Sequence, residues 1–213
     1  MDATRIGRFW YFVVRDPHGK ENVYMAEIYS ESTFCYQMAM KDLLERGFVI
    51  KAIVVDGKVA LSSWLFGDLP IQMCHFHQKQ IVVRYITQNP ILEAGKELLA
   101  FTNTLTLTNE KEFCLAFKNW CEKWKTFLNE KTLSESGKTS FYTHRNLRSA
   151  RDSIKRHLPY LFTFERYPEL NIPNTTNSLD GSFTKIKNSI AVHAGLSQKL
   201  KMKMVKTILE GEE

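Results

Sequence analysis

The first third of the chain carries the hydrophobic pattern of strands joined by tight turns. Residues 9–14 and 22–29 are runs of aromatic and β-branched side chains, and the turn-forming sequence Asp16-Pro17-His18-Gly19 lies between them. This pattern predicts an antiparallel hairpin. Residues 48–55 are almost continuously apolar, which is typical of a strand buried on both faces of a sheet. We therefore expect a third strand there, ending at Asp56-Gly57.

Segments with helical periodicity alternate with these strands. Between residues 33 and 46 the apolar positions are interleaved with polar ones, and Gly47 is well placed to end a helix. A short amphipathic segment follows at 59–66. Residues 71–74 predict a further strand that runs into a helix at 77–87. This alternation favours an α/β domain with a mixed sheet.

From Asn89-Pro90 onward the chain is predicted to be helical almost to its end. A broad apolar stripe at helical spacing predicts core packing. It consists of Phe113, Ala116, Phe117, Trp120, Trp124, Phe127 and Leu128. Residues 133–140 predict a surface loop, and the prolines at 168–176 predict an extended connection. Two last helices are expected at 178–190 and 197–209.

These elements predict an α/β core that carries an all-helical insertion. We expect the first part of the core at 1–88, the insertion at 89–170, and the C-terminal helical part of the core at 171–213. The length of 213 residues and a hydrophobic content of 44% are sufficient for such a core.

Composition argues against a membrane or an export signal. The sequence contains no run of 18 uncharged apolar residues, and its start lacks the apolar stretch of a signal peptide. We therefore expect a cytoplasmic protein. Four scattered cysteines are too few for a disulfide framework and are expected to be reduced thiols.

Basic residues are distributed unevenly along a chain whose net charge is +6. Between Asp180 and Glu210 there is no acidic residue, and this stretch contains Lys185, Lys187, Lys199, Lys201, Lys203 and Lys206. Upstream, Arg145, Arg148, Arg151 and Lys155 recur at intervals of three and four, which predicts one face of a helix. Such a face fits either a solvated helix surface or a surface that binds nucleic-acid phosphates.

One of three aspartates of interest, Asp56, lies where an α/β fold presents ligands. Asp56 follows a predicted strand, and open sheets bind ligands at the carboxyl ends of their strands, although Asp-Gly is also a plain turn signal. Asp2 lies in a short stretch ahead of the hairpin. Asp180 falls at the start of a predicted helix, where Asn177 as N-cap and Asp180 three residues later would form a variant of the capping box.

Cys74 and His77 form an isolated C-x-x-H pair. A structural zinc site needs four ligands, and no second pair of this kind completes one. We therefore expect Cys74 to be a small buried residue, and His77 either to satisfy a polar neighbour or to lie near the acidic site.

Four sequence blocks occur in a characteristic order: Val55-Asp56-Gly57, residues 70–78, residues 173–181 and Lys185-Ile186-Lys187. Together they resemble the signature blocks of Mutator-superfamily bacterial insertion-sequence transposases. The resemblance covers essentially the whole chain, including the helical insertion with its tryptophans. It implies a ribonuclease H-like mixed sheet, with the insertion preceding the last catalytic helix.

The resemblance also implies a chemistry, that of a DDE/DDD-type transposase, which cuts DNA at the ends of a mobile element and joins it to a target. The carboxylate triad is carried here by Asp2, Asp56 and Asp180, which would converge on two Mg²⁺ or Mn²⁺ ions. Such ions prefer oxygen ligands and assist in-line phosphoryl transfer. The expected partner is double-stranded DNA, on which the protein would form a homo-oligomer. The basic residues assigned to DNA are Arg145, Arg148, Arg151, Lys155, Lys185 and Lys187.

Two departures from the family pattern leave alternatives open. The third acidic residue of the family is commonly Glu, and Asp180 is one methylene shorter. Family members also have a DNA-binding region ahead of the first Asp, which these 213 residues do not contain. One alternative is therefore a truncated, non-catalytic DNA-binding protein derived from a transposase, and another is a ribonuclease H-like nuclease unrelated to transposition. Catalysis requires the three carboxylates to meet at one sheet edge, whereas Asp180 turned back to cap its own helix would favour the binding protein.

If the basic helix face contacts phosphates, DNA binding should weaken steeply with salt, independently of sequence. Neutralising Arg148 and Arg151 should then lower the slope of log affinity against log salt by roughly 1 for each lost contact. Titrations of a labelled duplex at several salt concentrations measure this slope. An unchanged slope would assign these residues to a solvated face.

Overall fold

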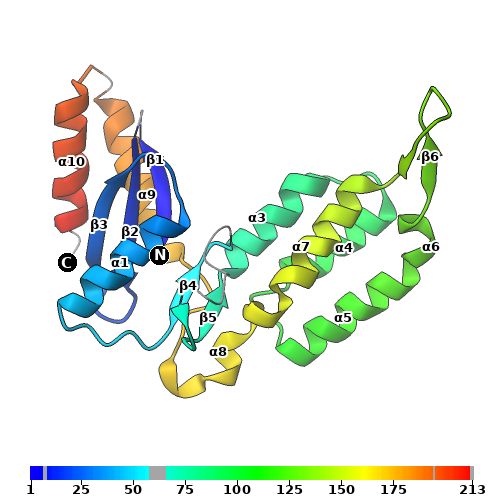
Figure 1. Ribbon diagram of the computed structural model, residues 1–213, viewed down its shortest axis with the longest axis horizontal. Helices are drawn as coiled ribbons and strands as arrows, with labels where there is room; N and C mark the ends of the chain where they lie inside the picture. The colour runs from blue at the N-terminus through cyan, green and yellow to red at the C-terminus, as the bar shows by residue number, and fades with distance from the viewer. Residues whose placement is uncertain (7–8, 58–65, 194, 212–213) are drawn as a thin grey trace.

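The computed structural model describes residues 1–6, 9–57, 66–193 and 195–211. The fold is mixed α/β, as expected (Figure 1). The strands are β1 (Asp2–Ile6), β2 (Phe9–Asp16), β3 (Glu21–Ile28), β4 (Ile53–Val55), β5 (Ile71–Met73), β6 (Lys131–Leu133) and β7 (Ser140–Tyr142). The helices are α1 (Thr33–Glu45), α3 (His75–Ile86), α4 (Glu93–Asn103), α5 (Glu110–Lys123), α6 (Lys125–Leu128), α7 (Arg145–Leu161), α8 (Thr163–Arg166), the 3-10 helix η1 (Pro168–Leu170), α9 (Asn177–Val192) and α10 (Gln198–Glu210). The amphipathic segment predicted at 59–66 lies, apart from Phe66, outside the described residues.

Two small sheets meet near the start of the chain. β1, β2 and β3 form an antiparallel sheet in that order, and β4 pairs in parallel with β5. The amino group of Met1, immediately before β1, donates a hydrogen bond to the carbonyl oxygen of Val54 in β4 at 2.9 Å. The start of β1 therefore lies beside β4.

Helices cover both faces of the three-stranded sheet (Figure 1). Alternate residues of β2 point to opposite faces, because side chains in a strand have a period of two. Phe12 and Val14 pack with α1 in one core, and Tyr11 and Val13 pack with α9 and α10 in another. The sheet is thus held between two helical layers, and α9 is fixed against it by buried apolar contacts.

The segment between β5 and α9 folds into a separate helical body. The predicted apolar stripe is confirmed as core, since Phe113, Phe117 and Trp120 of α5 are buried in one cluster with residues of α3, α4 and α7. The indole nitrogen of Trp120 donates to the carbonyl oxygen of Ala94 in α4 at 3.0 Å, which satisfies its one polar group. α3 belongs to this cluster although it precedes residue 89.

The helical body is attached to the sheet region through the outer edge of β5. The hydroxyl of Thr163 donates to the carbonyl oxygen of Ile71 at 2.6 Å. The side-chain amide of Gln72 donates to the carbonyl oxygen of Leu161 at 2.8 Å. These buried polar groups take the place of a neighbouring strand and leave fewer backbone groups unsatisfied.

Three further expectations can be compared with the fold. The predicted strand at 48–55 is wrong in length, because only Ile53–Val55 pair with a neighbour. Val49 is 82% exposed, so residue 49 lacks the burial on both faces that the apolar run predicted. The predicted loop at 133–140 is instead the turn and flanks of the β6–β7 hairpin. All four cysteines are free thiols, as expected.

No described helix combines the length and apolar character that crossing a membrane requires.

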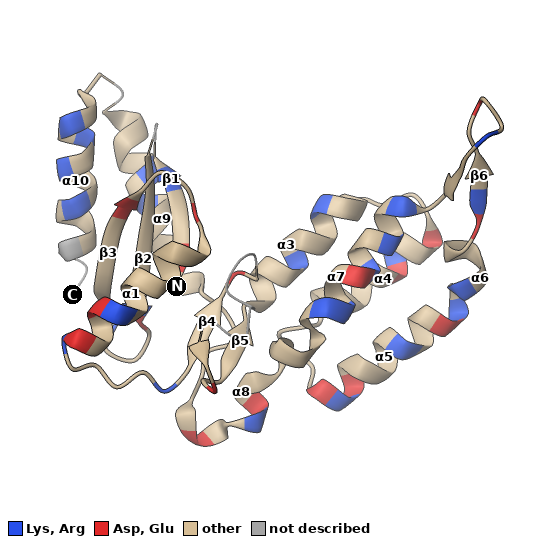
Figure 2. Cartoon of the chain, in the orientation of Figure 1, with Lys and Arg blue, Asp and Glu red and all other residues tan. Residues whose placement is uncertain are grey.

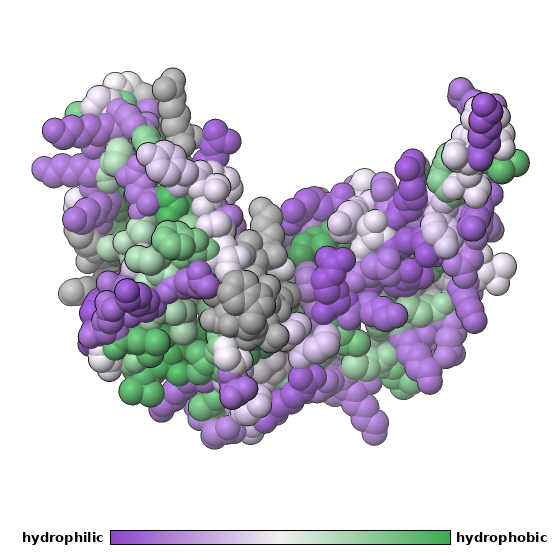
Figure 3. Space-filling view, in the orientation of Figure 1, coloured by the Kyte–Doolittle hydropathy of each residue, from purple (hydrophilic) through white to green (hydrophobic). Residues whose placement is uncertain are grey.

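One face of the molecule is hollowed between the α9–α10 layer and the far end of the helical body (Figure 3). Lysine and arginine residues recur along α10, α3 and α7, the helices that lie on either side of this hollow (Figure 2).

Gly57 is expected to be required for the turn that follows β4. Its φ of +91° disfavours an L side chain, and an added Cβ would lie 2.5 Å from the sulfur of the fully buried Met73. Gly57→Ala should therefore destabilise the protein by about 2 kcal/mol. Gly47→Ala is the matched control, since Gly47 has a φ of +83° but open space around it. Urea unfolding midpoints that shift equally for both variants would show that contact with Met73 adds nothing.

Candidate metal centre

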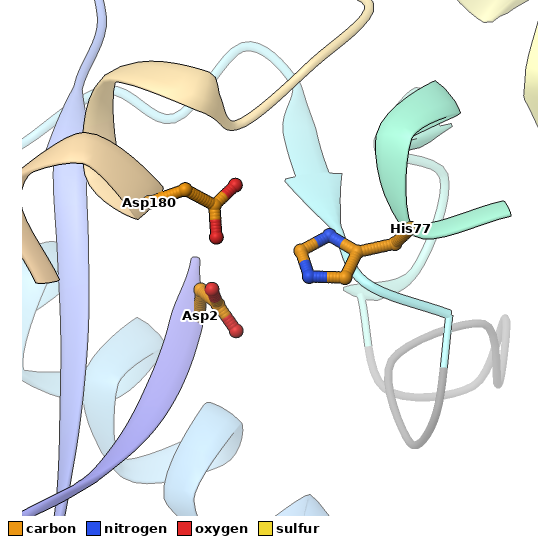
Figure 4. Close-up of side chains that lie close together, drawn as sticks. All are labelled: Asp2, His77 and Asp180. Carbon is orange, nitrogen blue, oxygen red and sulfur yellow. The ribbon is translucent and has the colours of Figure 1, made fainter. Parts of the chain in front are cut away.

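Three ionisable side chains from distant parts of the chain meet between the sheet and the helical body. Asp2 begins β1, His77 lies in the first turn of α3, and Asp180 lies in the first turn of α9 (Figure 4). One ligand atom from each lies within 4.8 Å of the other two. Asp2 is buried, and the other two side chains are partly buried. The arrangement offers two carboxylates and one imidazole to a single point.

Backbone hydrogen bonds hold the three elements in place. The backbone amide of Cys74 donates to the carbonyl oxygen of Val55 at 2.9 Å, which continues the β4–β5 pairing to the start of α3. The amide of His75 donates to the carbonyl oxygen of Asn174 at 2.9 Å. The segment before α9 is therefore bound to the first turn of α3, and this brings Asp180 to His77.

Thr176 links Asp180 to Cys74. Its backbone amide and its hydroxyl each lie 3.3 Å from the sulfur of Cys74, and its hydroxyl also lies 3.2 Å from Oδ2 of Asp180. Cys74 is fully buried, as predicted. Thr176, not Asn177, is the N-cap of α9, so the predicted capping box is wrong. The Asp180 carboxylate faces Asp2 and His77 (Figure 4).

The geometric expectation holds for Asp2 and Asp180, and Asp56 occupies a different place. Asp56 follows β4 and is partly buried, but it is not a member of the group of ligand atoms within 4.8 Å. Its charge nevertheless reaches Asp2, because it contributes to raising the pKa of the Asp2 carboxyl. Asp56 therefore lies at the margin of the centre, and His77 takes the close position.

Burial and neighbouring charges shift the acid–base properties of the centre. Burial raises the pKa of Asp2, and the charges of Asp56 and Asp180 add to this, so that it reaches about 7 despite the opposing effect of His77. Burial, and not mutual repulsion of the carboxylates, is the larger cause of this rise in the pKa of Asp2. Burial alone would lower the pKa of His77, yet Cys74, Asp2 and Asp180 together raise it to about 9.

Cys74 responds to the same neighbours. Burial raises the pKa of its thiol, but its interactions with His77 and the hydrogen bond from the Thr176 hydroxyl outweigh burial and lower it. Without a metal ion, the centre at neutral pH therefore holds an imidazolium among acidic groups.

The residue types fit a divalent cation. Carboxylate oxygens suit Mg²⁺ and Mn²⁺, whereas an imidazole nitrogen is a better ligand for Mn²⁺ than for Mg²⁺. Nδ1 of His77 is buried and has no hydrogen-bond partner within the described part of the chain. A buried nitrogen of this kind is costly unless something else satisfies it. From the sequence, His77 was expected either to satisfy a polar neighbour or to lie near the acidic site, and its C-x-x-H spacing was the available signal.

The predicted DNA-binding residues are a mixed group. Arg148 donates to the carbonyl oxygen of Leu128 and to the amide oxygen of Asn129, and Arg151 pairs with Asp152. These two arginines therefore make contacts within the protein. The remaining predicted residues, Arg145, Lys155, Lys185 and Lys187, are exposed on α7 and α9.

Comparison with known protein families, curated proteins and solved structures finds no match to this chain.

The raised pKa of Asp2 predicts how stability depends on pH in the metal-free protein. The folded state holds the Asp2 proton up to about pH 7, whereas the unfolded chain loses it near 3.8. This contribution to stability is complete below about pH 4 and is lost as the pH rises through about 7. Asp2→Asn should therefore stabilise the metal-free protein at pH 8 by about 1 kcal/mol or more, and much less at pH 5.

Chemical unfolding with a chelator present measures this difference. Asp68→Asn serves as the control, because Asp68 is exposed and lies outside the centre. An equal effect of Asp2→Asn at both pH values would contradict the prediction.

Proposed function

We propose that this chain is the catalytic core of a Mutator-type transposase, which cleaves DNA strands and transfers them with the aid of divalent metal ions. The observation that carries the proposal is the meeting of Asp2, His77 and Asp180 at one place. Asp2 and Asp180 come from the first strand and from a helix near the end of the chain, and His77 comes from the first helix of the helical body. A cluster that raises the pKa of a buried carboxyl to about 7 is costly to maintain, which is typical of a functional site.

The topology supports a ribonuclease H-like core. The hydrogen bond between Met1 and Val54 sets β1 next to β4, which gives the order β3-β2-β1-β4-β5 across the two sheets. β4 and β5 run parallel, and the helical body is inserted between β5 and α9. An insertion at this position, ahead of the helix that carries the third acid, is one feature that the resemblance implied.

Asp2 and Asp180 would hold a divalent ion, with His77 as a nitrogen ligand and Asp56 at the margin. Bound ions of this kind would stabilise the negative charge on the attacking and leaving oxygens of a phosphoryl transfer. The residues themselves exclude water from Asp2 and fix the direction of Asp180 through Thr176. In the metal-free protein the imidazolium of His77 compensates the negative charge, and it must lose its proton to act as a ligand.

The basic residues support a polyanionic substrate. Lys185 and Lys187 are exposed on α9, the helix whose first turn carries Asp180, and Arg145 and Lys155 are exposed on α7.

Water would be the nucleophile for strand cleavage, and the freed 3′-hydroxyl the nucleophile for joining to target DNA.

The position of Asp56 favours a second candidate, a non-catalytic DNA-binding protein. Asp56 lies outside the group formed by the other three side chains. A two-ion site needs enough carboxylates for both ions, so the marginal place of Asp56 is the observation that favours this alternative. Metal binding and DNA cleavage distinguish the two candidates.

Substitutions of Asp180 test the proposed function. Asp180→Asn should lower Mn²⁺-dependent nicking of a supercoiled plasmid by roughly 100-fold or more, since it removes a metal ligand's charge. Asp180→Glu should retain much of the activity, because a carboxylate remains and Glu is common at this position in the family. Mn²⁺ affinity, measured by calorimetry, should follow the same order.

Asp68→Asn, an exposed change, is the control and should leave both quantities unchanged. Full nicking by Asp180→Asn, or wild-type protein that binds no Mn²⁺, would contradict the catalytic function.

A further inference from the structure

The β6–β7 hairpin extends beyond the helical body at the end opposite the metal centre (Figure 1). All six residues of its strands are exposed, so the hairpin contributes nothing to a hydrophobic core. Two-stranded hairpins without such packing are marginally stable on their own. Some other requirement must therefore account for an element of this kind.

The base of the hairpin is held firmly. The backbone amide of Thr143 donates to the carbonyl oxygen of Glu130 at 2.9 Å, and Nε2 of His144 donates to the carboxylate of Glu130 at 3.0 Å. The ring of His144 stacks on Phe127 with a centroid distance of 3.7 Å. The hairpin is thus an exposed ribbon on a fixed base.

The ribbon combines apolar and cationic groups. Leu133 is 68% exposed, and the rings of Phe141 and Tyr142 are also exposed. The guanidinium of Arg148 lies 3.5 Å from the centre of the Tyr142 ring, and that of Arg145 lies 4.9 Å from the centre of Phe141. Residues 130–148 contain four basic residues and two acidic ones, and one of the acids, Glu130, is bound to His144.

We propose that this hairpin enters the major groove of double-stranded DNA. The major groove is wide enough to admit a two-stranded β-ribbon. Lys131 and Lys138 are placed to reach phosphates at the groove edges, and Leu133 and Tyr142 offer apolar contact to thymine methyl groups. The inference rests on the proposed function, and it specifies that the β6–β7 hairpin contacts the DNA and that it does so in the major groove.

The position of the hairpin indicates which part of the DNA it meets. It lies across the hollow of Figure 3 from the α9–α10 layer, and the elements that carry the metal centre begin between the two. A duplex with its scissile phosphate at Asp2 and Asp180 would therefore meet the hairpin at a distance from the cut. α7 begins at Arg145, directly after the base of the hairpin, and its Arg145 and Lys155 are exposed basic residues.

Removing the hairpin tests the proposal. In the full chain, residues 131–142 are replaced by Gly-Gly, which joins Glu130 to Thr143, two residues already hydrogen-bonded to each other. Affinity for a labelled duplex should fall at least about tenfold, while the melting temperature and Mn²⁺ affinity stay unchanged. Lys131→Gln with Lys138→Gln should reduce the salt dependence, and Lys118→Gln on α5 is the matched exposed control.

The groove itself is tested by chemical interference. Methylation of guanine N7, which lies in the major groove, should weaken binding by the intact protein and have little effect on the hairpin-deleted protein. Distamycin, a minor-groove ligand, should not compete at the hairpin contact.

Equal duplex affinity with and without the hairpin would overturn this inference alone and leave the proposed function standing. A change in oligomeric mass on deletion, with duplex affinity preserved, would assign the hairpin to contact with a second copy of the chain. An intact chain that binds no duplex at all would overturn the proposed function as well.

Discussion

The hydrogen bonds that join residues 74–75 to residues 174–176 are the constraint on which the rest of the structure depends. The bonds between Cys74 and Thr176 connect positions 102 residues apart, on either side of the helical body. The carbonyl oxygen of Asn174 accepts from the backbone of His75, and Thr176 donates twice to the sulfur of Cys74. Without this connection, α9 would have no fixed point at which to leave the helical body and return to the sheet.

The same connection explains why the metal centre is formed from two bodies. α9 is held along its length by apolar contacts of Leu179, Phe183 and Ile186 with the sheet, but these contacts alone do not fix where the helix begins. The attachment of Thr176 does, and one turn later it places Asp180 beside His77. The helical body meanwhile is held to β5 through Gln72 and Thr163, so α3 cannot shift relative to the sheet without breaking buried hydrogen bonds.

Electrostatics sets the condition under which this centre is stable. Carboxyl groups at close range with little solvent repel each other, and burial disfavours their charged forms. The fold meets this cost in the metal-free state with a retained proton on Asp2 and an imidazolium at His77. A divalent ion would remove the need for both, which links metal binding to proton release. These electrostatic conditions do not apply to the β6–β7 hairpin or to the exposed basic residues of α7 and α9. Their side chains lie in water and interact weakly with the core.

Periodicity in the sequence determined the hairpin of β2 and β3, the buried stripe of α5 and the alternation of strands and helices, because each follows from local side-chain spacing. Periodicity did not mark Asp2 and Asp180 as candidate ligands; only the resemblance of the sequence blocks to a transposase family did. The length of β4 depended on the fold, since a strand requires a paired neighbour and only Ile53–Val55 pair with β5. Only the fold decided that His77, and not Asp56, joins the two aspartates, because that depends on where residues 174–176 attach to the start of α3. The exposed β6–β7 pair and the internal contacts of Arg148 also depend on neighbours distant in sequence, and no local pattern encodes them.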